Sequence, residues 1–310
     1  MKAAHDSAPP RIRSKLFVPC SRPELFDKAF AGAADAISFD LEDAVREEAK
    51  DGARQHLVDW LQRASAPPAS KLVIVRVNAV DSPHFAADLA ACARAGVDWV
   101  NLPKVESAAQ VLDAESLLHE WERNRGLDAR IGLLVNIESP AGLHRAADIA
   151  SASERVAGLQ LGLGDLFVAL GIDRSNAYAV AQTRFQVRCA AAQAGVSAYD
   201  AACAEVRDET VFARDAQEGK AMGYAGKSCI HPRQVGWANA IFGPSEAQIA
   251  QALRLLQARD ATENHVRGAF VFEGAMVDAA NFRLAQSIFE QAAVNASPPA
   301  QALRQGKTSQ

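Results

Sequence analysis

The sequence contains no long apolar run. No stretch approaches the roughly 18 consecutive apolar residues that a membrane-spanning helix needs, so we expect no membrane span. The opening residues, MKAAHDSAPPRIRS, include no apolar segment of signal-peptide type, so we expect no secretory signal. The 33 Lys and Arg residues against 37 Asp and Glu residues give a formal net charge of -4. This balance gives no general attraction to nucleic acid or to an anionic membrane.

Cysteine is scarce, and its positions exclude two common frameworks. The five cysteines are Cys20, Cys92, Cys189, Cys203 and Cys229, and no two of them have C-x-x-C spacing. The odd number and the wide scatter argue against a zinc site and against a set of disulfides. A reducing compartment fits this pattern, and we therefore expect a cytoplasmic protein.

Short apolar runs rich in β-branched residues recur along the chain, with Ala-rich stretches of helical spacing between them. The predicted strands are 15–19, 36–42, 71–78, 97–104, 131–138, 159–165, a weak one at 197–201, and 226–232. Strand followed by helix, about eight times over, is the pattern of a TIM (β/α)8 barrel. A doubly wound sheet is the alternative, but no G-x-G-x-x-G follows the first predicted strand. We predict an α/β barrel as the catalytic domain over residues 11–243.

The pattern changes after about Gly243. A helix is predicted to begin at Ser245, with Glu246 in its first turn, and a hairpin-like piece and a further helix follow. We therefore predict a C-terminal helical lid and oligomerisation segment over 244–295. Residues 1–10 and 296–310 are predicted to be flexible tails.

Polar side chains gather at the ends of the predicted strands, where barrels of this kind carry their active sites. Glu138 and Asp165 each close an apolar run, on strands predicted to be neighbours. Two adjacent carboxylates repel unless a cation lies between them, and Mg²⁺ favours one or two protein carboxylates. An Arg or Lys partner for each carboxylate explains the same residues, so spacing alone leaves both interpretations open.

Three further features have both a functional and a structural interpretation. Arg76 interrupts the run VIVRVN, and a planar anion, from a substrate or from the protein, explains such a guanidinium. His231 precedes Pro232, and a structural role is the favoured interpretation for it. The N-terminal region also concentrates basic residues, which would suit a phosphate-rich ligand or simply form a solvated surface: Arg11, Arg13, Lys15, Arg22 and Lys28.

Taken together, eight motifs resemble one family in their order and spacing. They are RSKLFVPCSRPELFDKA, DAISFDLEDAV, VIVRVN, VNLPKVES, LLVNIESPAGL, LGLGDLFVALG, AMGYAGKSCIHPRQV and FEGAMVDAANFRLAQ. The chain is similar over about residues 11–292 to the citrate lyase β-subunit-like proteins of the HpcH/HpaI aldolase and citrate lyase superfamily, which include malyl-CoA and citramalyl-CoA lyases. Each motif alone is weak, but the ordered set is specific.

The resemblance implies a Mg²⁺-dependent TIM barrel that assembles as a homotrimer or hexamer. Such enzymes cleave or form the C–C bond between an acetyl-CoA unit and a 2-oxo acid. By resemblance, Glu138 and Asp165 are the metal ligands, Arg76 holds the 2-oxo acid, and Asp278 is an acid on a lid that reaches a neighbouring subunit. The same resemblance implies a set of residues that bind the CoA thioester and line its site: Phe17, Arg22, Lys28, Gly164, Ile230 and His231.

The substrate and the setting stay open at this stage. Gly164 before Asp165, and Ser139-Pro140 after Glu138, depart from common family patterns and leave the acid undecided among citramalyl-CoA, malyl-CoA and citryl-CoA types. We lean toward citramalyl-CoA. A 2-oxo acid aldolase that works without CoA is one alternative, although the stretch DLEDAV lacks the His usual there. A citrate lyase β subunit acting on a carrier-bound thioester is another, and a non-catalytic CoA-binding module ranks last.

Overall fold

The structure is a computed structural model that describes residues 12–63, 71–94, 96–127, 130–260 and 269–295. The chain divides into two compact units, residues 1–242 and 243–310, and each is described by itself. The predicted flexible tails, together with Arg11, lie outside the described residues. No helix in the described ranges is both long enough and apolar enough to cross a membrane.

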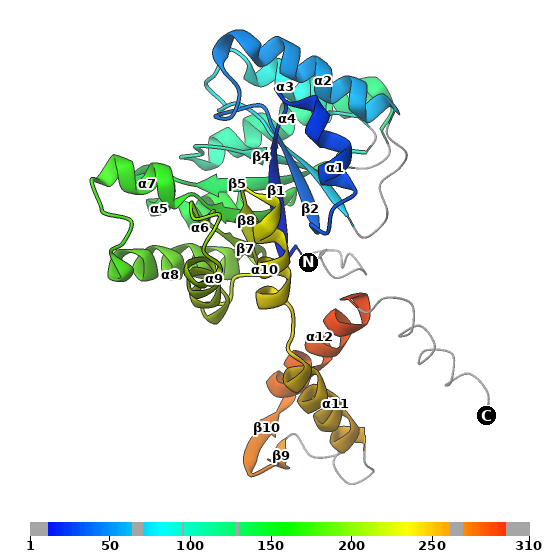
Figure 1. Cartoon of the computed structure of the whole chain (residues 1–310), viewed down its shortest axis with the longest axis vertical. Coiled ribbons are helices and arrows are strands. Elements are labelled where there is room, and N and C mark those ends of the chain that lie inside the picture. Colours follow the sequence, from blue (N-terminus) through cyan, green and yellow to red (C-terminus); the bar gives the residue numbers. More distant parts are fainter. Residues whose placement is uncertain (1–11, 64–70, 95, 128–129, 261–268, 296–310) are drawn as a thin grey trace, which may run out of the picture. The chain divides into compact units, whose positions relative to one another are not determined.

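The larger unit is a closed barrel of eight parallel strands, in the order β1 to β8 around the ring (Figure 1). The barrel expected from the sequence is therefore confirmed. Its strands are β1 (Ser14–Pro19), β2 (Ala36–Asp40), β3 (Leu72–Arg76), β4 (Trp99–Leu102), β5 (Gly132–Ile137), β6 (Val156–Leu161), β7 (Ser197–Asp200) and β8 (Gly226–Cys229). The ring closes where β1 pairs with β8, with Leu16 opposite Cys229.

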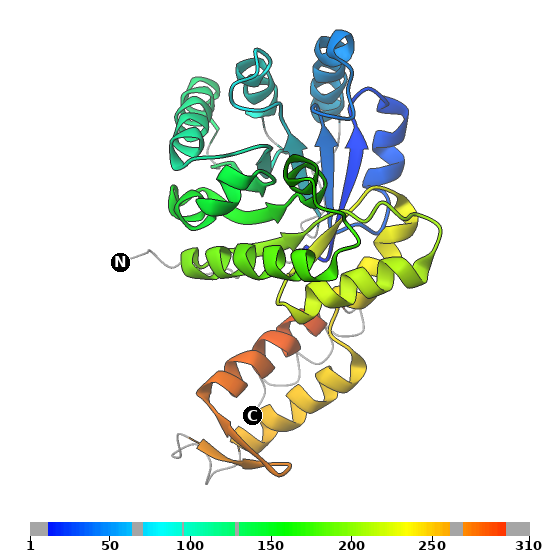
Figure 2. The same cartoon turned by 90° about the vertical axis from the view of Figure 1, so that its left-hand side faces the viewer.

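Helices lie around the outside of the strands (Figure 2). They are α1 (Phe26–Phe30), α2 (Lys50–Arg63), α3 (Phe85–Cys92), α4 (Ala108–Arg125), α5 (Pro140–His144), α6 (Ala146–Ser151), α7 (Leu163–Leu170), α8 (Ala177–Ala194), α9 (Glu209–Ala221) and α10 (Pro232–Phe242), with 3₁₀ turns η1 (Pro23–Leu25) and η2 (Glu47–Ala49). Their starts follow local chemistry. Ser107, for example, caps α4 in a reciprocal pair with Gln110.

Side chains of the strands alternate between two apolar cores. Outward residues such as Val73, Val75 and Ile137 join the core between strands and helices. Inward residues such as Ile74 and Leu134 form a smaller cluster inside the barrel. This alternation follows from the period of two along a strand, and it leaves every second residue of each strand pointing into the barrel.

Within the barrel, polar side chains also cross between strands that are not neighbours. Lys15 of β1 donates to Asn101 of β4, with 3.2 Å between Nζ and Oδ1. Ser228 of β8 donates to Gln160 of β6 at 3.0 Å. Hydrogen bonds between non-adjacent strands pass through the interior, so the barrel contains a polar layer in addition to its apolar cluster.

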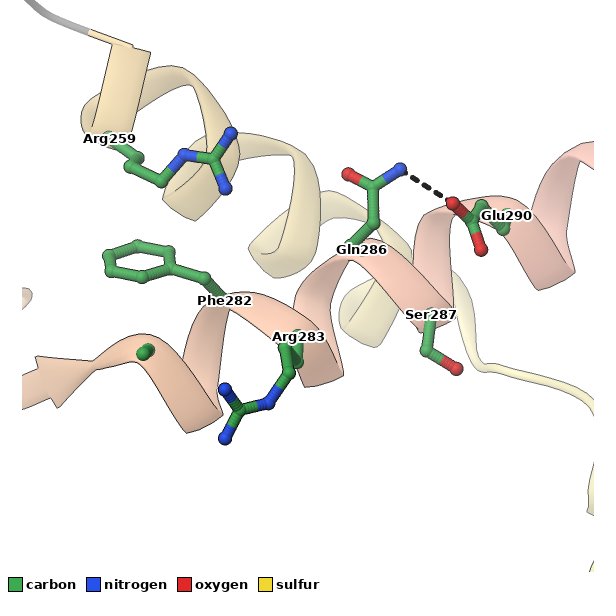
Figure 3. A pocket seen from close by; sticks show the side chains of 7 residues that line it. Arg259, Phe282, Arg283, Gln286, Ser287 and Glu290 are labelled. Carbon is green, nitrogen blue, oxygen red and sulfur yellow. Dashed lines mark hydrogen bonds between the residues drawn. The ribbon is translucent and has the colours of Figure 1, made fainter. Parts of the chain in front are cut away.

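The smaller unit consists of α11 (Glu246–Asp260), the antiparallel strands β9 (Ala269–Phe272) and β10 (Ala275–Asp278), and α12 (Ala279–Asn295). The predicted helix start is confirmed, because the Ser245 hydroxyl accepts from the Gln248 amide at 3.2 Å. The two helices share an apolar core that includes Leu255, Val277 and Phe282. Figure 3 shows a hollow on this unit, where the Arg259 guanidinium lies 5.7 Å from the centre of the Phe282 ring.

Seven predicted strands extend past the observed strand end, and two of them run into a helix. The eighth was expected to reach Pro232, but β8 ends at Cys229 and Pro232 begins α10. The sixth strand was expected to continue to Asp165, but β6 ends at Leu161 and α7 begins at Leu163. The amide of Leu166 donates to the Gly162 carbonyl at 3.3 Å, so the helical bonding pattern begins at Gly162. Asp165 therefore lies in the first turn of a helix instead of at a strand end.

Candidate functional site

Charged side chains converge at the C-terminal ends of β2, β3, β4 and β5. Arg76, the last residue of β3, donates through Nε and Nη2 to the two carboxylate oxygens of Asp40, at 2.8 and 2.6 Å. Its Nη1 lies 2.9 Å from Glu42 and 3.6 Å from Asp43. Protein carboxylates thus account for the guanidinium in VIVRVN. These neighbours keep the pKa of Arg76 above its ordinary value in spite of its burial.

Glu138 follows β5 directly and is buried, with 5% of its surface exposed. Its Oε1 accepts from the backbone N–H of Lys104 at 2.7 Å, and its Oε2 accepts from Asn136 at 3.1 Å. Burial, together with the nearby carboxylates Glu42 and Asp165, raises the pKa of Glu138 to about 7. This carboxylate is therefore held in place, and among the described residues no cationic side chain contacts it directly.

The turn after Glu138 begins a helix. The Ser139 hydroxyl accepts from the Gly142 amide at 3.1 Å, and Pro140 occupies the first turn of α5. Serine as the N-cap and proline directly after it are the residues that this position favours. The stretch Ser139-Pro140 thus ends the strand sharply and leaves the Glu138 side chain in the barrel mouth.

Lys104 joins two parts of the site. It has φ of 52°, a left-handed conformation that is uncommon for a residue other than glycine, and strain of this kind often marks functional loops. Its backbone N–H bonds Glu138, while its side-chain ammonium contacts Glu42 at 2.6 Å and Asp43 at 3.2 Å. The same residue therefore fixes one carboxylate through the main chain and balances two others through its side chain.

Asp165 is exposed in the first turn of α7, and its carboxylate is close enough to contribute to the raised pKa of Glu138. Gly162 lies directly against the Glu138 side chain. A Cβ on Gly162 would collide with the Cβ and Oε2 of Glu138, so glycine leaves room for the Glu138 carboxylate there.

The residues present fit a magnesium ion. Five carboxylates (Asp40, Glu42, Asp43, Glu138 and Asp165) face the mouth with Arg76 and Lys104 among them, which leaves an excess of negative charge. The described residues contain no group of three or more His, Cys, Asp or Glu side chains suited to a metal. Two carboxylates with open positions for water and substrate oxygens are the arrangement that Mg²⁺ accepts.

The residues expected to bind CoA differ in their surroundings. Phe17 of β1 is partly buried, and its ring faces the Arg76 guanidinium, with 4.9 Å between Cζ and the ring centre. Arg22 and Lys28 are exposed, and Arg22 pairs with Glu24 at 3.0 Å. Gly164 is exposed next to Asp165, and Ile230 is exposed at the end of β8.

His231 has a clear local role. Its Nδ1 accepts from the Arg233 amide at 3.1 Å, and its carbonyl accepts from Gln234 at 3.0 Å, so the residue caps the start of α10. The structural interpretation favoured from the sequence matches these contacts.

One basic cluster predicted near the N-terminus does not form as a surface patch. Arg13 pairs with Asp35 at 2.8 Å, whereas Lys15 is buried inside the barrel with 1% of its surface exposed. Alternation along β1 explains the difference, because the side chain of Lys15 faces the interior. This charge could have been recognised from its place within the strand pattern of KLFVP.

Sequence reasoning also assigned no role to the amides next to Lys15. Asn101 lies inside the apolar run of β4, and its Nδ2 donates to Asn136 at 2.7 Å. Both asparagines are buried. Their signal in the sequence was an amide at an inward position of a buried strand, where an apolar side chain is the common choice.

Asp278 lies at the end of β10, in the smaller unit. Its Oδ1 accepts from the backbone of Ala280 at 2.8 Å and of Asn281 at 3.3 Å, while its own N–H donates to Asn281 at 3.0 Å. It therefore caps α12 and is exposed. A structural reason for an acidic residue here thus exists beside any chemical one.

Comparisons with known proteins agree on one family. The model of the HpcH/HpaI aldolase/citrate lyase family matches residues 13–232. The citrate lyase subunit beta of Escherichia coli strain K12 is 37% identical over 86% of this chain and 88% of its own length. The L-malyl-CoA/beta-methylmalyl-CoA lyase of Rhodobacter capsulatus is 32% identical over 92% and 96%. The CitE protein of Mycobacterium tuberculosis, solved with magnesium, acetoacetate and coenzyme A, is 32% identical with a TM-score of 0.72, over 92% of this chain and 99% of its own.

Proposed function

Because the chain belongs to the HpcH/HpaI aldolase/citrate lyase family, we propose that it is a Mg²⁺-dependent carbon–carbon lyase acting on a CoA thioester. The reaction is cleavage of a 3-hydroxy-3-carboxyacyl-CoA to acetyl-CoA and a 2-oxo acid. One observation carries the proposal: a buried carboxylate, Glu138, is held by two hydrogen bonds in an excess of negative charge without a cationic partner in contact. The magnesium and coenzyme A bound by the M. tuberculosis relative support it.

In this proposal Glu138 and Asp165 hold the metal. When bound, magnesium supplies Lewis-acid stabilisation of the negative charge that develops on the substrate's 3-oxygen and adjacent carboxylate. Arg76 adds a fixed positive charge nearby and orients the 2-oxo acid. Nε and Nη2 of Arg76 bond Asp40, so a substrate oxygen would share Nη1 with Glu42, which lies 2.9 Å from it.

The cleavage is a retro-Claisen step. The 3-hydroxyl gives its proton to solvent water, the C–C bond breaks, and the electron pair of that bond passes to the thioester, which becomes an enolate. The oxygen that lost its proton becomes the carbonyl of the 2-oxo acid. Asp278 then delivers a proton to the enolate carbon, which completes acetyl-CoA, and it is reprotonated by solvent. We propose that the protein is a homotrimer or hexamer in which Asp278 on the lid of one subunit acts at the barrel of a neighbour. We also propose that it works in the cytoplasm, where its five free cysteines remain reduced.

Binding of the CoA moiety falls to residues around the barrel mouth. Phe17 offers an aromatic face, Arg22 and Lys28 offer exposed cations for phosphate groups, and Ile230 offers apolar surface beside His231. Gly164 leaves open space beside Asp165, since a Cβ there would have only Arg174 near it, at 3.9 Å. We propose citramalyl-CoA as the substrate. Malyl-CoA and citryl-CoA are competing candidates, because a binding site discriminates one methylene by only about 1–3 kcal/mol.

A second candidate is a citrate lyase β subunit that acts on a carrier-bound citryl thioester, which the 37% identity to the E. coli subunit favours. Free citramalyl-CoA, malyl-CoA and citryl-CoA tested with the purified protein separate the two candidates. Release of acetyl-CoA from a free thioester by the protein alone supports the stand-alone enzyme. Turnover only after addition of an acyl carrier and partner subunits supports the second candidate.

The same assay tests the site. Glu138→Gln, which keeps the size of the side chain but removes its charge, is expected to lower Mg²⁺-dependent turnover by at least 100-fold, and excess chelator should do the same to the unmodified protein. Full turnover of either in chelator would contradict the metal assignment. Asp278→Asn preserves an N-cap oxygen for α12 but cannot deliver a proton, so turnover should fall while the thermal midpoint stays unchanged. Asp278→Ala should lower both.

A further inference from the structure

A chain of side-chain hydrogen bonds runs through the barrel interior from β1 to Glu138. Lys15 Nζ donates to Asn101 Oδ1 at 3.2 Å, Asn101 Nδ2 donates to Asn136 Oδ1 at 2.7 Å, and Asn136 Nδ2 donates to Glu138 Oε2 at 3.1 Å. These four residues come from β1, β4, β5 and the residue after β5. All four are buried, so the chain is shielded from bulk water.

The direction of this chain is fixed at its start. The ammonium form of lysine only donates, so it requires Asn101 to turn its oxygen toward Lys15 and its nitrogen away from it. The nitrogen of Asn101 also donates to the Leu134 carbonyl at 2.9 Å, which requires the same orientation. Asn136 then presents its oxygen to Asn101 and its nitrogen to Glu138. Glu138 thus receives a donor from a chain whose direction Lys15 and the Leu134 carbonyl set together.

The two oxygens of Glu138 are held from different sides. The Lys104 backbone N–H donates to Oε1 at 2.7 Å and Asn136 donates to Oε2. Two donors on a carboxylate fix its plane while leaving one lone pair on each oxygen for a cation. An Asn136 amide turned the other way would place oxygen against oxygen and push the carboxylate out of this orientation.

Lys15 itself has few partners for a buried amine. Apart from Asn101, its Nζ faces the Phe17 ring, 4.4 Å from the ring centre, and among the described residues no ion pair includes it. Burial and the neighbouring Arg76 lower the pKa of Lys15 to about 7. A lysine in this position costs stability that an apolar residue would not. Its contact with Asn101 is the feature that gives it a role.

We propose that Lys15, Asn101 and Asn136 are positioning residues that orient the Glu138 carboxylate for the metal. The inference rests on the proposed function in one respect, because it takes Glu138 as a metal ligand. It adds that the ligand's orientation is set from the opposite wall of the barrel. Partners of metal ligands typically contribute about 10–100-fold to metal affinity.

The test is Mn²⁺ binding, used as a probe for Mg²⁺ and measured by isothermal titration with the full chain. Lys15→Met should weaken binding by about 10-fold or more. Asn101→Asp is nearly isosteric and should also weaken it, because a carboxylate accepts from Lys15 but donates nothing to Asn136. An added negative charge alone would tighten cation binding, so the sign of this change separates lost orientation from simple electrostatics. Turnover of both variants should recover largely at saturating Mn²⁺.

Ser228→Ala is the matched control. It removes a buried hydrogen bond to Gln160 in the same interior, with no link to Glu138, so binding should change less than 2-fold even if stability falls. Wild-type Mn²⁺ affinity in folded Asn101→Asp, or tighter binding, overturns the positioning role, and this variant decides the matter if Lys15→Met does not fold. Glu138→Gln distinguishes the two failures. If Glu138→Gln binds Mn²⁺ normally, the metal assignment itself is wrong. If Glu138→Gln loses Mn²⁺ binding while Lys15→Met and Asn101→Asp bind Mn²⁺ normally, only the positioning role is rejected.

Discussion

Lys15 and Glu138 both lie in the barrel interior, where burial destabilises the charged form of each side chain. Burial lowers the pKa of Lys15 to about 7 and raises that of Glu138 to about 7, so each is shifted toward its neutral form. Each is retained in spite of this cost. A hydrogen-bonded chain between them offers a reason that neither residue offers alone.

The lysine gives a pH-dependent stability that can be measured. Between pH 7 and about 10.5, the unfolded chain holds a proton on Lys15 that the folded protein has lost. Stability contributed by this residue therefore rises with pH across that window, by up to about 1.4 kcal/mol per pH unit, and is lost as pH falls toward 7. Lys15→Met should remove this dependence. Urea unfolding of both proteins at pH 7, 8 and 9 should show the advantage of the variant shrinking as pH rises.

Other titrating groups are common to both proteins and cancel in this comparison. A constant difference across the three pH values would mean that Lys15 is charged in the folded state at all of them.

Single residues also show how far sequence reasoning reaches. Arg76 was recognisable because a guanidinium inside VIVRVN breaks an apolar run, but its partners were not, since Asp40, Glu42 and Asp43 come from another strand and its loop. Lys15 was assigned to a basic surface because its neighbours in sequence are basic. Alternate residues of β1 point into the barrel, and which ones do so depends on the register of β1 in the closed barrel. This register places Lys15 in the interior.

The junction between β6 and α7 shows the same limit at the scale of elements. Leucine occupies every second position from Leu159 to Leu163, so the sequence pattern gives no sign that the strand ends at Leu161. The chain turns at Gly162, where the absence of a side chain makes room for Glu138. The strand and helix assignments themselves needed only periodicity, while this boundary depends on a contact with another strand's end.

Gly162→Ala tests this junction. The added methyl group would overlap Glu138, so we expect Mn²⁺ affinity to fall at least 10-fold and stability to fall by about 1–3 kcal/mol, as for an overpacked site. Gly52→Ala is the matched control, because its added Cβ meets nothing within 4 Å on the exposed side of α2. That change should leave metal binding as it is and stabilise the helix by roughly 0.5–1 kcal/mol. Equal effects of Gly162→Ala and Gly52→Ala on Mn²⁺ affinity would mean that Glu138 moves away from the added methyl group without losing metal binding.

At the scale of the whole molecule, the eightfold alternation of strand and helix was enough to predict the barrel. The order of the strands then brings Arg76, Lys104 and Glu138 to one end without further assumption, because parallel strands place their C-termini together. How subunits associate depends on surfaces that have no periodic signal, and the resemblance alone suggests it.

A mixing experiment tests the proposed exchange of lids. Arg76→Ala removes the barrel cation and Asp278→Asn removes the lid acid, so each homo-oligomer should be nearly inactive. Subunits mixed after reversible dissociation should regain up to about a quarter of wild-type turnover if the lid of one serves the barrel of another, since a barrel with Arg76 must meet a lid with Asp278. The regained activity should rise and fall with the mixing ratio. No recovery in oligomers shown by mass spectrometry to contain both variants would place the lid acid within its own subunit.

The double role of Lys104 has a consequence for how this enzyme can diversify. Its bond to Glu138 comes from the main chain, so any residue except proline at position 104 can supply it, and glycine or asparagine would adopt φ of 52° with little strain. Its side chain alone sets the charge beside Glu42 and Asp43. Natural variation at this position can therefore retune the electrostatics that a substrate meets while the geometry around Glu138 is inherited unchanged.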